Sequence, residues 1–296
     1  MDKIYLKTRA KINLTLNVLN KRPDNYHNIE SVFQKISLYD ELFIEKNISN
    51  KFELSCNIKE LECDSNILFK TYNKLKEAYP SISGVSVKLI KNIPMQAGLG
   101  GGSTNCASFV QGMNTLFNLN MTKEEIINLG KTLGADVVPC MFNTVKSEGI
   151  GDIVTPFKSN LKYYILIVKP DFNCNTKIMY EKLDKEKNLK QEYYTNEVIN
   201  ILKTGETKEL KNKLYNVFEY ALEEKTLLDN IKNDFINSGA INTLLSGSGS
   251  CIYGIYSNKE DIKKAYNFMK NKYNYNFYKC ISYNNFKGDL KWAKRK

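Results

Sequence analysis

Four glycines crowd into the segment Pro94-Met-Gln-Ala-Gly-Leu-Gly-Gly-Gly-Ser-Thr104, although the whole chain of 296 residues holds only 16. Glycine loses more conformational freedom on folding than any other residue, so such a cluster needs a reason. Without Cβ atoms, the backbone can approach a bound group closely and adopt positive φ, which turns successive N–H groups toward one anion. The segment therefore predicts a loop that holds phosphate, with a plain glycine-rich turn as the alternative.

The residues on either side of this loop favour the phosphate interpretation. Residues 85–89 alternate like a strand, and apolar residues recur at helical spacing over 104–118. A helix at this place would direct its positive dipole end at the loop. The loop is not a Walker A sequence, because no lysine stands before its Ser-Thr, nor the dinucleotide fingerprint, which needs Gly or Ala where Ser103 stands.

The remaining secondary-structure signals divide the chain into two α+β halves. In the first half we expect strands at 4–10, 12–19, 29–37 and 42–46, and helices at 66–79, capped by Asp64 or Ser65, and from the capping box of Thr122 and Glu125 to 133. In the second half we expect strands at 163–168, 241–245, 251–256 and 275–281, and helices at 208–223, 227–237 and 259–272. This order predicts two α+β domains, 1–155 and 156–296, with a cleft between them.

Composition excludes several classes of protein. Seven cysteines without a Cys-x-x-Cys pair argue against a disulfide framework or a zinc site, and one histidine, His27, cannot build a histidine-rich metal site. No run of residues is apolar enough to span a membrane, and no signal peptide is evident, so we expect a cytoplasmic protein without a membrane partner. The net charge of +11 suits an anionic partner or reflects solvated lysines, and the five basic residues of 287–296 predict a solvated tail.

Two places near the N-terminus are candidates for chemistry. Lys11 and Asn13 would share one face of a strand, opposite Ile12, Leu14 and Leu16. A lysine there is either a solvated edge residue or a charge that meets a phosphate or lowers the pKa of a hydroxyl. The adjacent Tyr26 and His27 could stack on and hydrogen-bond a planar ligand, or simply fill a turn.

Two further loops complete the set of candidates. Asp136 follows a helix end, where the macrodipole disfavours an aspartate, so it has either a functional role or a loop-ordering hydrogen bond. The sequence Leu245-Ser-Gly-Ser-Gly-Ser250 is a second loop of small residues between two strands, and a hairpin turn is its simplest interpretation.

In this order the motifs resemble the GHMP kinases, the family of galactokinase, homoserine kinase, mevalonate kinase and phosphomevalonate kinase. The resemblance runs from about 7 to 257 and rests on Lys11-Ile-Asn-Leu, on the glycine-rich loop and on Leu245-Ser-Gly-Ser-Gly. The extension to Tyr26-His27 and the sequence Gly134-Ala-Asp136-Val resemble the branch that phosphorylates the erythritol part of a cytidine-diphosphate-linked polyol in the non-mevalonate isoprenoid pathway.

The resemblance implies an N-terminal domain like domain 2 of ribosomal protein S5, a ferredoxin-like C-terminal domain and an active site in the cleft. It implies that ATP lies on Pro94, Met95, Gln96, Ala97, Gly98, Leu99, Gly100, Gly101, Gly102, Ser103 and Thr104. Asp136 would be the general base and Lys11 would orient the hydroxyl, while Asn13 would bind the polar end of the substrate and Tyr26, His27 and Tyr180 the cytosine. Mg2+ is expected with ATP, near the hydroxyl of Ser103 or Thr104.

Three local sequences depart from the family pattern. Asn25 replaces a glycine before Tyr26, Asp136-Val-Val-Pro139 is one residue longer than Asp-Val-Pro, and Ser250-Cys251 replaces Pro-Thr. Another GHMP kinase, of the homoserine or mevalonate type, is the first alternative, and a basic RNA-binding protein is the second. We expect a small-molecule partner and no nucleic acid, and the sequence leaves the oligomeric state open, a homodimer included.

Overall fold

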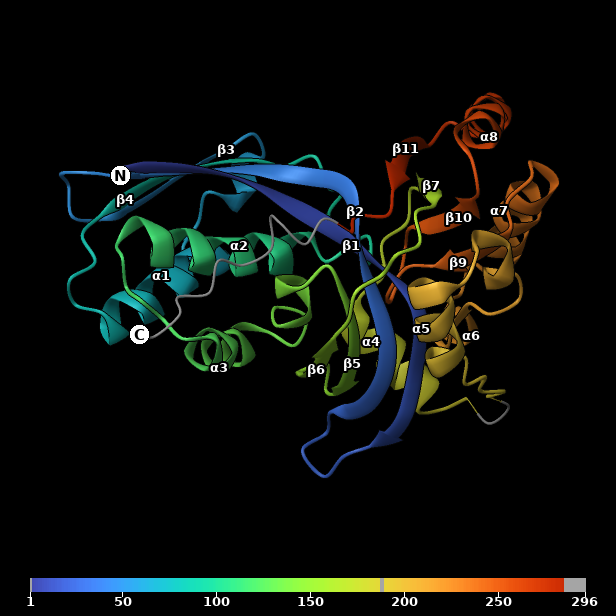
Figure 1. Ribbon diagram of the computed structural model, residues 1–296, viewed down its shortest axis with the longest axis horizontal. Coiled ribbons are helices and arrows are strands. Elements are labelled where there is room, and N and C mark those ends of the chain that lie inside the picture. Colours follow the sequence, from blue (N-terminus) through green and yellow to red (C-terminus); the bar gives the residue numbers. More distant parts are fainter. Residues whose placement is uncertain (1, 187–188, 285–296) are drawn as a thin grey trace.

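The computed structural model describes residues 2–186 and 189–284, and two sheets form its scaffold (Figure 1). The first sheet contains β1 (Lys3–Lys21), β2 (His27–Lys46), β3 (Phe52–Cys56), β4 (Val85–Ile90), β5 (Thr144–Gly149), β6 (Ile153–Pro156) and β8 (Tyr215–Asn216). Its main path is β3-β4-β2-β1-β8, and β5 pairs with both β2 and β6. The second sheet, in the order β11-β7-β10-β9, contains β7 (Tyr164–Lys169), β9 (Asn242–Leu245), β10 (Ile252–Tyr256) and β11 (Asn276–Ile281).

Helices flank both sheets. On the N-terminal side these are α1 (Ile67–Ala78), α2 (Gly101–Leu116) and α3 (Lys123–Leu133), with the 3-10 turns η1 (Lys59–Leu61) and η2 (Pro139–Met141). On the C-terminal side they are α4 (Thr176–Leu183), α5 (Thr195–Thr204), α6 (Phe218–Ala221), α7 (Lys225–Asn237) and α8 (Lys259–Lys272), with the 3-10 turn η3 (Thr207–Leu210). In Figure 1, α1, α2 and α3 lie along one face of the first sheet, and α7 and α8 lie beyond the second.

One hydrophobic cluster joins the two sheets. Ile12 and Leu14 of β1 lie in it with Ile165 of β7 and Tyr253 of β10, all fully buried. Burial of one such aliphatic side chain contributes roughly 1.5–3 kcal/mol of transfer free energy. The apolar face of β1 therefore packs one sheet against the other, which leaves Lys11 and Asn13 on the opposite face.

The predicted α+β class is confirmed, and several elements match their predicted positions. The helix at 259–272 is α8 with the predicted bounds, and Thr122 and Glu125 form the expected capping box of α3. The helix at 66–79 is α1, but Asn66 caps it, accepting a hydrogen bond from the amide of Leu68, in place of Asp64 or Ser65. The basic tail predicted at 287–296 lies outside the described residues.

Long-range pairing overturns three predictions. The strands expected at 4–10 and 12–19 are one strand, because pairing with β2 continues through bulges that break the alternation, and the same holds for 29–37 and 42–46. The helix expected at 208–223 is wrong: η3, β8 and α6 replace it, since Tyr215 and Asn216 pair in parallel with Thr15 and Leu16. The charged stretch before residue 200 contains α4 and the first half of α5, and neither helix was predicted.

Candidate active site

A cavity of about 860 Å³ lies between the glycine-rich loop and the strands and helices around it. Ten of the eleven residues 94–104 line it, together with Lys11, Asn13, Asp136, Tyr180 and the loop residues 247–249. Thr104, the eleventh, is buried inside α2 and does not line the cavity. The structure thus brings motifs that are far apart in the sequence to one hollow.

The glycine-rich loop adopts the backbone that its sequence predicts. Gly98 and Gly100 have φ of 72° and 66°, in the left-handed region that glycine occupies without strain. A Cβ on Gly98 would lie 1.8 Å from the carbonyl oxygen of Ser246. The Ser246 hydroxyl in turn donates to the Gly98 carbonyl at 3.0 Å. The glycine-rich loop therefore rests directly on the second loop of small residues.

The helix after the loop begins earlier than predicted. Helix α2 starts at Gly101 and not at Thr104, because Gly100 caps it in the left-handed conformation. A Cβ on Gly102 would meet no atom within 4 Å, so this first turn borders open space in the cavity. The unpaired N–H groups and the positive dipole end of the helix favour an anion there, and the first turn carries no acidic residue.

Lys11 and Asp136 meet at the cavity wall. Lys11 Nζ lies 3.5 Å from Asp136 Oδ2 and donates a hydrogen bond of 2.8 Å to Asn13 Oδ1. Lys11 is nearly buried, with 5% of its side chain exposed, whereas 39% of the Asp136 side chain is exposed. The extra residue after Asp136 is absorbed by the turn that leads into η2, and the carboxylate still borders the cavity. The pair can offer a fixed cation and an accessible carboxylate to one hydroxyl.

Cys140 lies close to this pair without taking part in its chemistry. Its side chain is 2% exposed, and its sulfur would lie 3.5 Å from a Cβ on Gly100. Burial, followed by the charge of Asp136, raises the pKa of the thiol to about 12. Cys140 is therefore protonated near neutral pH and is no candidate nucleophile.

A β-bulge changes which side chains of β1 reach the cavity. Asn13 pairs with Phe33 and Thr15 with Val32, so the residue between them has no counterpart on β2. Lys11 and Asn13 share a face as predicted, but Leu16 also lines the cavity and does not oppose them. The alternation assumed from the sequence fails at the bulge, because one extra residue reverses the faces that follow it.

The aromatic residues are arranged differently from a simple clamp. Tyr180 of α4 lines the cavity, whereas Tyr26 and His27 do not. The His27 ring stacks on Tyr180 with centroids 4.7 Å apart and an interplanar angle of 14°, and Tyr26 is 59% exposed. Asn25 has φ of 65°, so it adopts the positive φ expected where the family pattern has glycine.

No sequence motif pointed to the residue that holds His27. Asp184, just after α4, accepts 2.7 Å and 2.6 Å contacts from His27 Nε2 and Lys21 Nζ. The Lys21 ammonium, and after it His27, holds the pKa of Asp184 below its usual range against the effect of burial. This contact ties the β1–β2 hairpin to the C-terminal half of the chain.

Hydrogen bonds from residues outside the motifs hold the loop 246–250 in place, and the sequence did not predict them. Asn216 of β8 is 2% exposed, and its side-chain amide donates to the carbonyls of Leu245 and Gly247, each at 2.8 Å. Thr176 at the start of α4 makes a 2.8 Å hydroxyl contact with Ser248. Asn216 was hidden in the segment predicted as a helix, so no motif pointed to it.

Residues 2–186 and 189–284 contain no group of three or more His, Cys, Asp or Glu side chains that could hold a metal by themselves. A divalent ion here would need phosphate oxygens and water as its main ligands, which is how Mg2+ is commonly bound beside nucleotides. Ser103 lines the cavity and offers a hydroxyl, whereas that of Thr104 is buried without a partner. In the same part of the chain, none of the helices has the length and apolar character needed to cross a membrane.

Comparison with known proteins gives consistent matches. The model of the GHMP kinases N terminal domain matches residues 66–144, and the GHMP kinases C terminal model matches 201–275. The 4-diphosphocytidyl-2-C-methyl-D-erythritol kinase of Alkaliphilus oremlandii is 36% identical over 273 residues, 91% of this chain and 93% of that protein. The enzyme of the same name from Caldicellulosiruptor saccharolyticus is 38% identical over 270 residues, 90% of this chain and 93% of that protein.

Solved structures show the same fold. A crystal structure of 4-(cytidine 5'-diphospho)-2C-methyl-D-erythritol kinase has a TM-score of 0.80 at 23% identity, covering 95% of this chain and all of that one. A homoserine kinase from Cytophaga hutchinsonii has a TM-score of 0.75 at 18% identity, covering 96% of both chains. At these identities the structural likeness establishes the architecture, and the choice of substrate depends on the site.

Proposed function

Because this chain belongs to the GHMP kinase family, alongside its 4-diphosphocytidyl-2-C-methyl-D-erythritol kinases, we propose that it carries out their reaction in the non-mevalonate isoprenoid pathway. The chain is an ATP-dependent small-molecule kinase. The proposed reaction transfers the γ-phosphoryl group of ATP to the 2-hydroxyl of 4-diphosphocytidyl-2-C-methyl-D-erythritol. The observation that carries the proposal is the meeting of Lys11, Asp136 and the glycine-rich loop in one cavity.

The glycine-rich loop and the start of α2 are proposed to hold the triphosphate. Gly98 and Gly100 let the backbone turn toward the cavity, and the first turn of α2 adds N–H donors and a positive dipole. The loop lacks the lysine of a Walker A sequence, but Lys11 lies next to it: a Cβ on Gly100 would come within 3.0 Å of Lys11 carbons. A cation thus stands near the transferred group.

Asp136 is proposed as the general base and Lys11 as its partner. Asp136 accepts the proton of the substrate hydroxyl while that oxygen attacks the γ-phosphorus, the bond to the β,γ-bridging oxygen breaks and ADP leaves. Lys11 orients the hydroxyl and offsets negative charge that develops on the transferred group. Asn13, which accepts a hydrogen bond from Lys11, is proposed to bind the polar end of the substrate.

The nucleoside end of the substrate is proposed to lie against Tyr180. Its ring lines the cavity, stacks on His27 and meets Phe218 edge-on with centroids 4.9 Å apart. Such a ring offers a flat apolar face to cytosine, which mevalonate and homoserine lack. We still propose Tyr26 and His27 as cytosine-binding residues. Because neither lines the cavity, the hairpin tip or Tyr180 must move before these two residues can contact the base.

Mg2+ is proposed to enter with ATP, bound mainly by phosphate oxygens, with Ser103 offering the hydroxyl at the cavity wall. When bound, the ion neutralises negative charge on the phosphates. The change of sheet between β6 and β7 supports the proposed domains 1–155 and 156–296, although β8 returns to the first sheet. The homodimer and the cytoplasmic location remain predictions.

The decisive experiment measures ADP release with three acceptors: the cytidine-linked methylerythritol, mevalonate and homoserine. We expect turnover with the first alone and competitive inhibition of it by CDP. Turnover with homoserine or mevalonate and no effect of CDP would assign another GHMP kinase activity. Salt-dependent binding of polynucleotides without ADP release would favour the RNA-binding alternative.

A further inference from the structure

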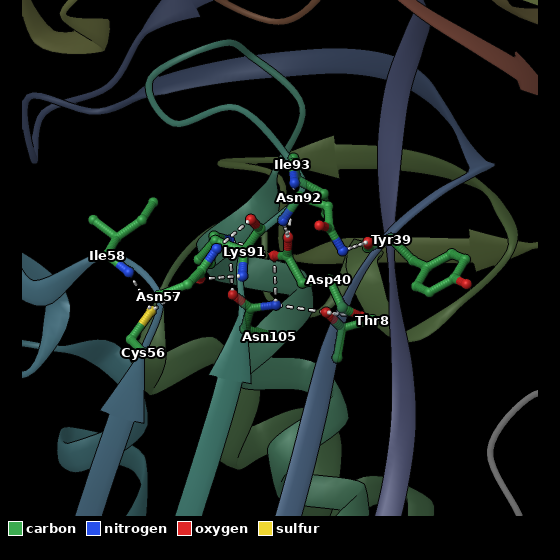
Figure 2. A network of polar contacts seen from close by, with 10 residues as sticks. All are labelled: Thr8, Tyr39, Asp40, Cys56, Asn57, Ile58, Lys91, Asn92, Ile93 and Asn105. Atoms are coloured by element: carbon green, nitrogen blue, oxygen red, sulfur yellow. Dashed lines mark hydrogen bonds and ion pairs between the residues drawn. The ribbon is translucent and has the colours of Figure 1, made fainter.

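A buried carboxylate outside the proposed chemistry lies behind the glycine-rich loop. Asp40 of β2 is fully buried and pairs with the ammonium of Lys91, which is nearly as buried. Asn105 of α2 joins this pair, accepting a 2.9 Å hydrogen bond from Lys91 Nζ and donating at 2.9 Å to Asp40 Oδ2. Figure 2 shows the three side chains converging at the end of β4.

The same carboxylate holds both ends of the loop. Asp40 Oδ1 accepts from the backbone amides of Asn92 and Ile93 at 2.7 Å and 2.8 Å, immediately before Pro94. Asp40 Oδ2 accepts from Asn105, immediately after Thr104 (Figure 2). The entry and exit of the segment 94–104 are therefore fixed to one side chain.

Secondary contacts make this attachment rigid. Asn105 Nδ2 also donates to Thr8 Oγ1 of β1 at 2.5 Å, and the backbone of Lys91 exchanges two hydrogen bonds with the side chain of Asn57. The network thus joins β1, β2, the end of β4 and α2 (Figure 2). Because a carboxylate and an ammonium are costly to bury apart, each member depends on the others remaining in place.

The network also reaches the cavity. Lys91 and Asn105 line it, and a Cβ on Gly101 would lie 3.1 Å from Lys91 Nζ. A cation beside the positive end of α2 is unfavourable unless an anion offsets it, and Asp40 supplies that anion when no nucleotide is bound. A side chain at position 101 would therefore require Lys91 or Ile93 to shift.

We propose that Asp40 is a positioning residue for ATP, which holds the ends of the glycine-rich loop so that its N–H groups are oriented for phosphate before ATP binds. This rests on the proposed function only in taking the loop as the nucleotide site. A preformed loop has less conformational entropy to lose on binding. Loss of the preformed conformation should therefore weaken nucleotide affinity more than it changes the rate of the chemical step.

The test compares Asp40→Asn with a matched control, Asp234→Asn. Asp234 is also a buried carboxylate, paired with Lys272 and Tyr273, but it lies on α7 and does not line the cavity. For each full-length variant we would measure the midpoint of thermal unfolding, KM for ATP, kcat, KM for the acceptor and the Kd of ADP by calorimetry. Both variants are expected to unfold at lower temperature.

Only Asp40→Asn is expected to raise KM for ATP and Kd for ADP, each by about tenfold or more, with KM for the acceptor within twofold of the original. Hydrogen exchange at 98–102 should accelerate in this variant and slow again when ADP is added. Equal loss of thermal stability in both variants with unchanged ADP affinity would overturn the proposal.

Asn105→Ala keeps the proposal testable if Asp40→Asn does not fold, because it leaves the Asp40–Lys91 ion pair and the entry contacts intact. It removes the exit contact, together with the hydrogen bonds of Asn105 to Lys91 and Thr8. We expect at least a threefold rise in the Kd of ADP, and no change would count against the proposal. Since ADP binding is measured without an acceptor, these outcomes do not depend on which hydroxyl the enzyme phosphorylates. A wrong substrate assignment would show in the acceptor assay alone.

Discussion

Lys11 Nζ lies 3.5 Å from Asp136 Oδ2, and the two residues differ sharply in their access to solvent. The lysine is enclosed by Asn13, Phe33 and the backbone of the two loops, whereas the carboxylate is open to the cavity. A buried cation and the accessible anion beside it can both contact a hydroxyl that approaches from the cavity. The first two predictions separate their roles.

Asp136→Asn should lower kcat by at least about 10²-fold, because the amide cannot accept the hydroxyl proton. The affinity for ADP should change little, since the glycine-rich loop is untouched. Steady-state kinetics and calorimetry measure the two quantities. Asp152→Asn, which alters a carboxylate outside the cavity lining, is the control. A kcat near that of the unchanged enzyme would falsify the role of Asp136 as base.

Lys11→Met should also lower kcat by orders of magnitude, because it removes the cation that offsets charge in the transition state. Lys11→Arg should restore little of the rate, since the larger guanidinium does not fit the space beside Gly100 and Gly247. Single-turnover measurements would show the loss in the chemical step. Full activity in the arginine variant would mean that charge alone, and not its position, matters.

Two glycines of the loop should respond in opposite ways. Gly98→Ala places a Cβ against the Ser246 carbonyl at positive φ, so it should lower the free energy of unfolding by about 1–3 kcal/mol. Gly102→Ala meets no atom in the free enzyme and should raise this free energy by about 0.4–1 kcal/mol while weakening ATP binding. Thermal unfolding with and without ATP distinguishes them, and unimpaired ATP binding by Gly102→Ala would place the phosphates elsewhere.

Tyr180→Ala should raise KM for the cytidine-linked substrate by about tenfold, which corresponds to the roughly 1–3 kcal/mol of stacking a base on an aromatic ring. KM for ATP should remain within twofold. Tyr180→Phe keeps the ring and is the matched control, with an expected KM close to the original. Equal effects of Tyr180→Ala on both substrates would indicate a general disturbance of the cavity.

The contacts of Asp184 with Lys21, and after it with His27, predict a dependence of stability on pH. The pKa of Asp184 is lowered in the folded protein, so its ionised form stabilises the fold at pH above the unfolded value of about 3.9. This contribution should shrink as pH falls below that value and vanish once the folded carboxylate is protonated.

Denaturant unfolding of the original chain and of Asp184→Asn from pH 7 to pH 2 tests this prediction. The original should be the more stable at pH 7, and the two curves should converge at the acid end. Glu223→Gln removes the exposed ion-pair partner of Lys182, a residue of α4. The stability of this variant should differ little from that of the original at any pH. Curves for Asp184→Asn that stay parallel to the original would contradict the assignment.

Local signals in the sequence explain which parts could be predicted. Helix α8 has its cap at Asn258 and a regular apolar spacing, and both operate within a few residues. The glycine-rich loop, Lys11 and Asp136 carry short motifs, so they could be found and related to one another by a family resemblance. Their meeting in one cavity is a property of the fold.

Residues that act through distant partners could not be predicted. Asn216 lies in a strand of two residues that exists only because β1 offers a free edge, and helical spacing around it was misleading. Asp40 stands in an ordinary strand sequence, and its importance comes from Ile93 and Asn105, which are remote in the chain. Asp184 belongs to no sequence motif, and its role depends on His27, which the β1–β2 hairpin brings next to it only in the folded chain.

The β-bulge after Asn13 changes which alternate residues of β1 face the cavity. Before it, the odd-numbered Lys11 and Asn13 face the cavity; after it, the even-numbered Leu16 does. Deleting the unpaired residue would therefore leave Lys11, Asn13 and Leu16 on the cavity side in plain alternation, whereas an unbroken alternation at the present length would turn Leu16 away from the cavity. Along this strand, the number of residues between two side chains decides, as much as their identity, which of them reach the cavity.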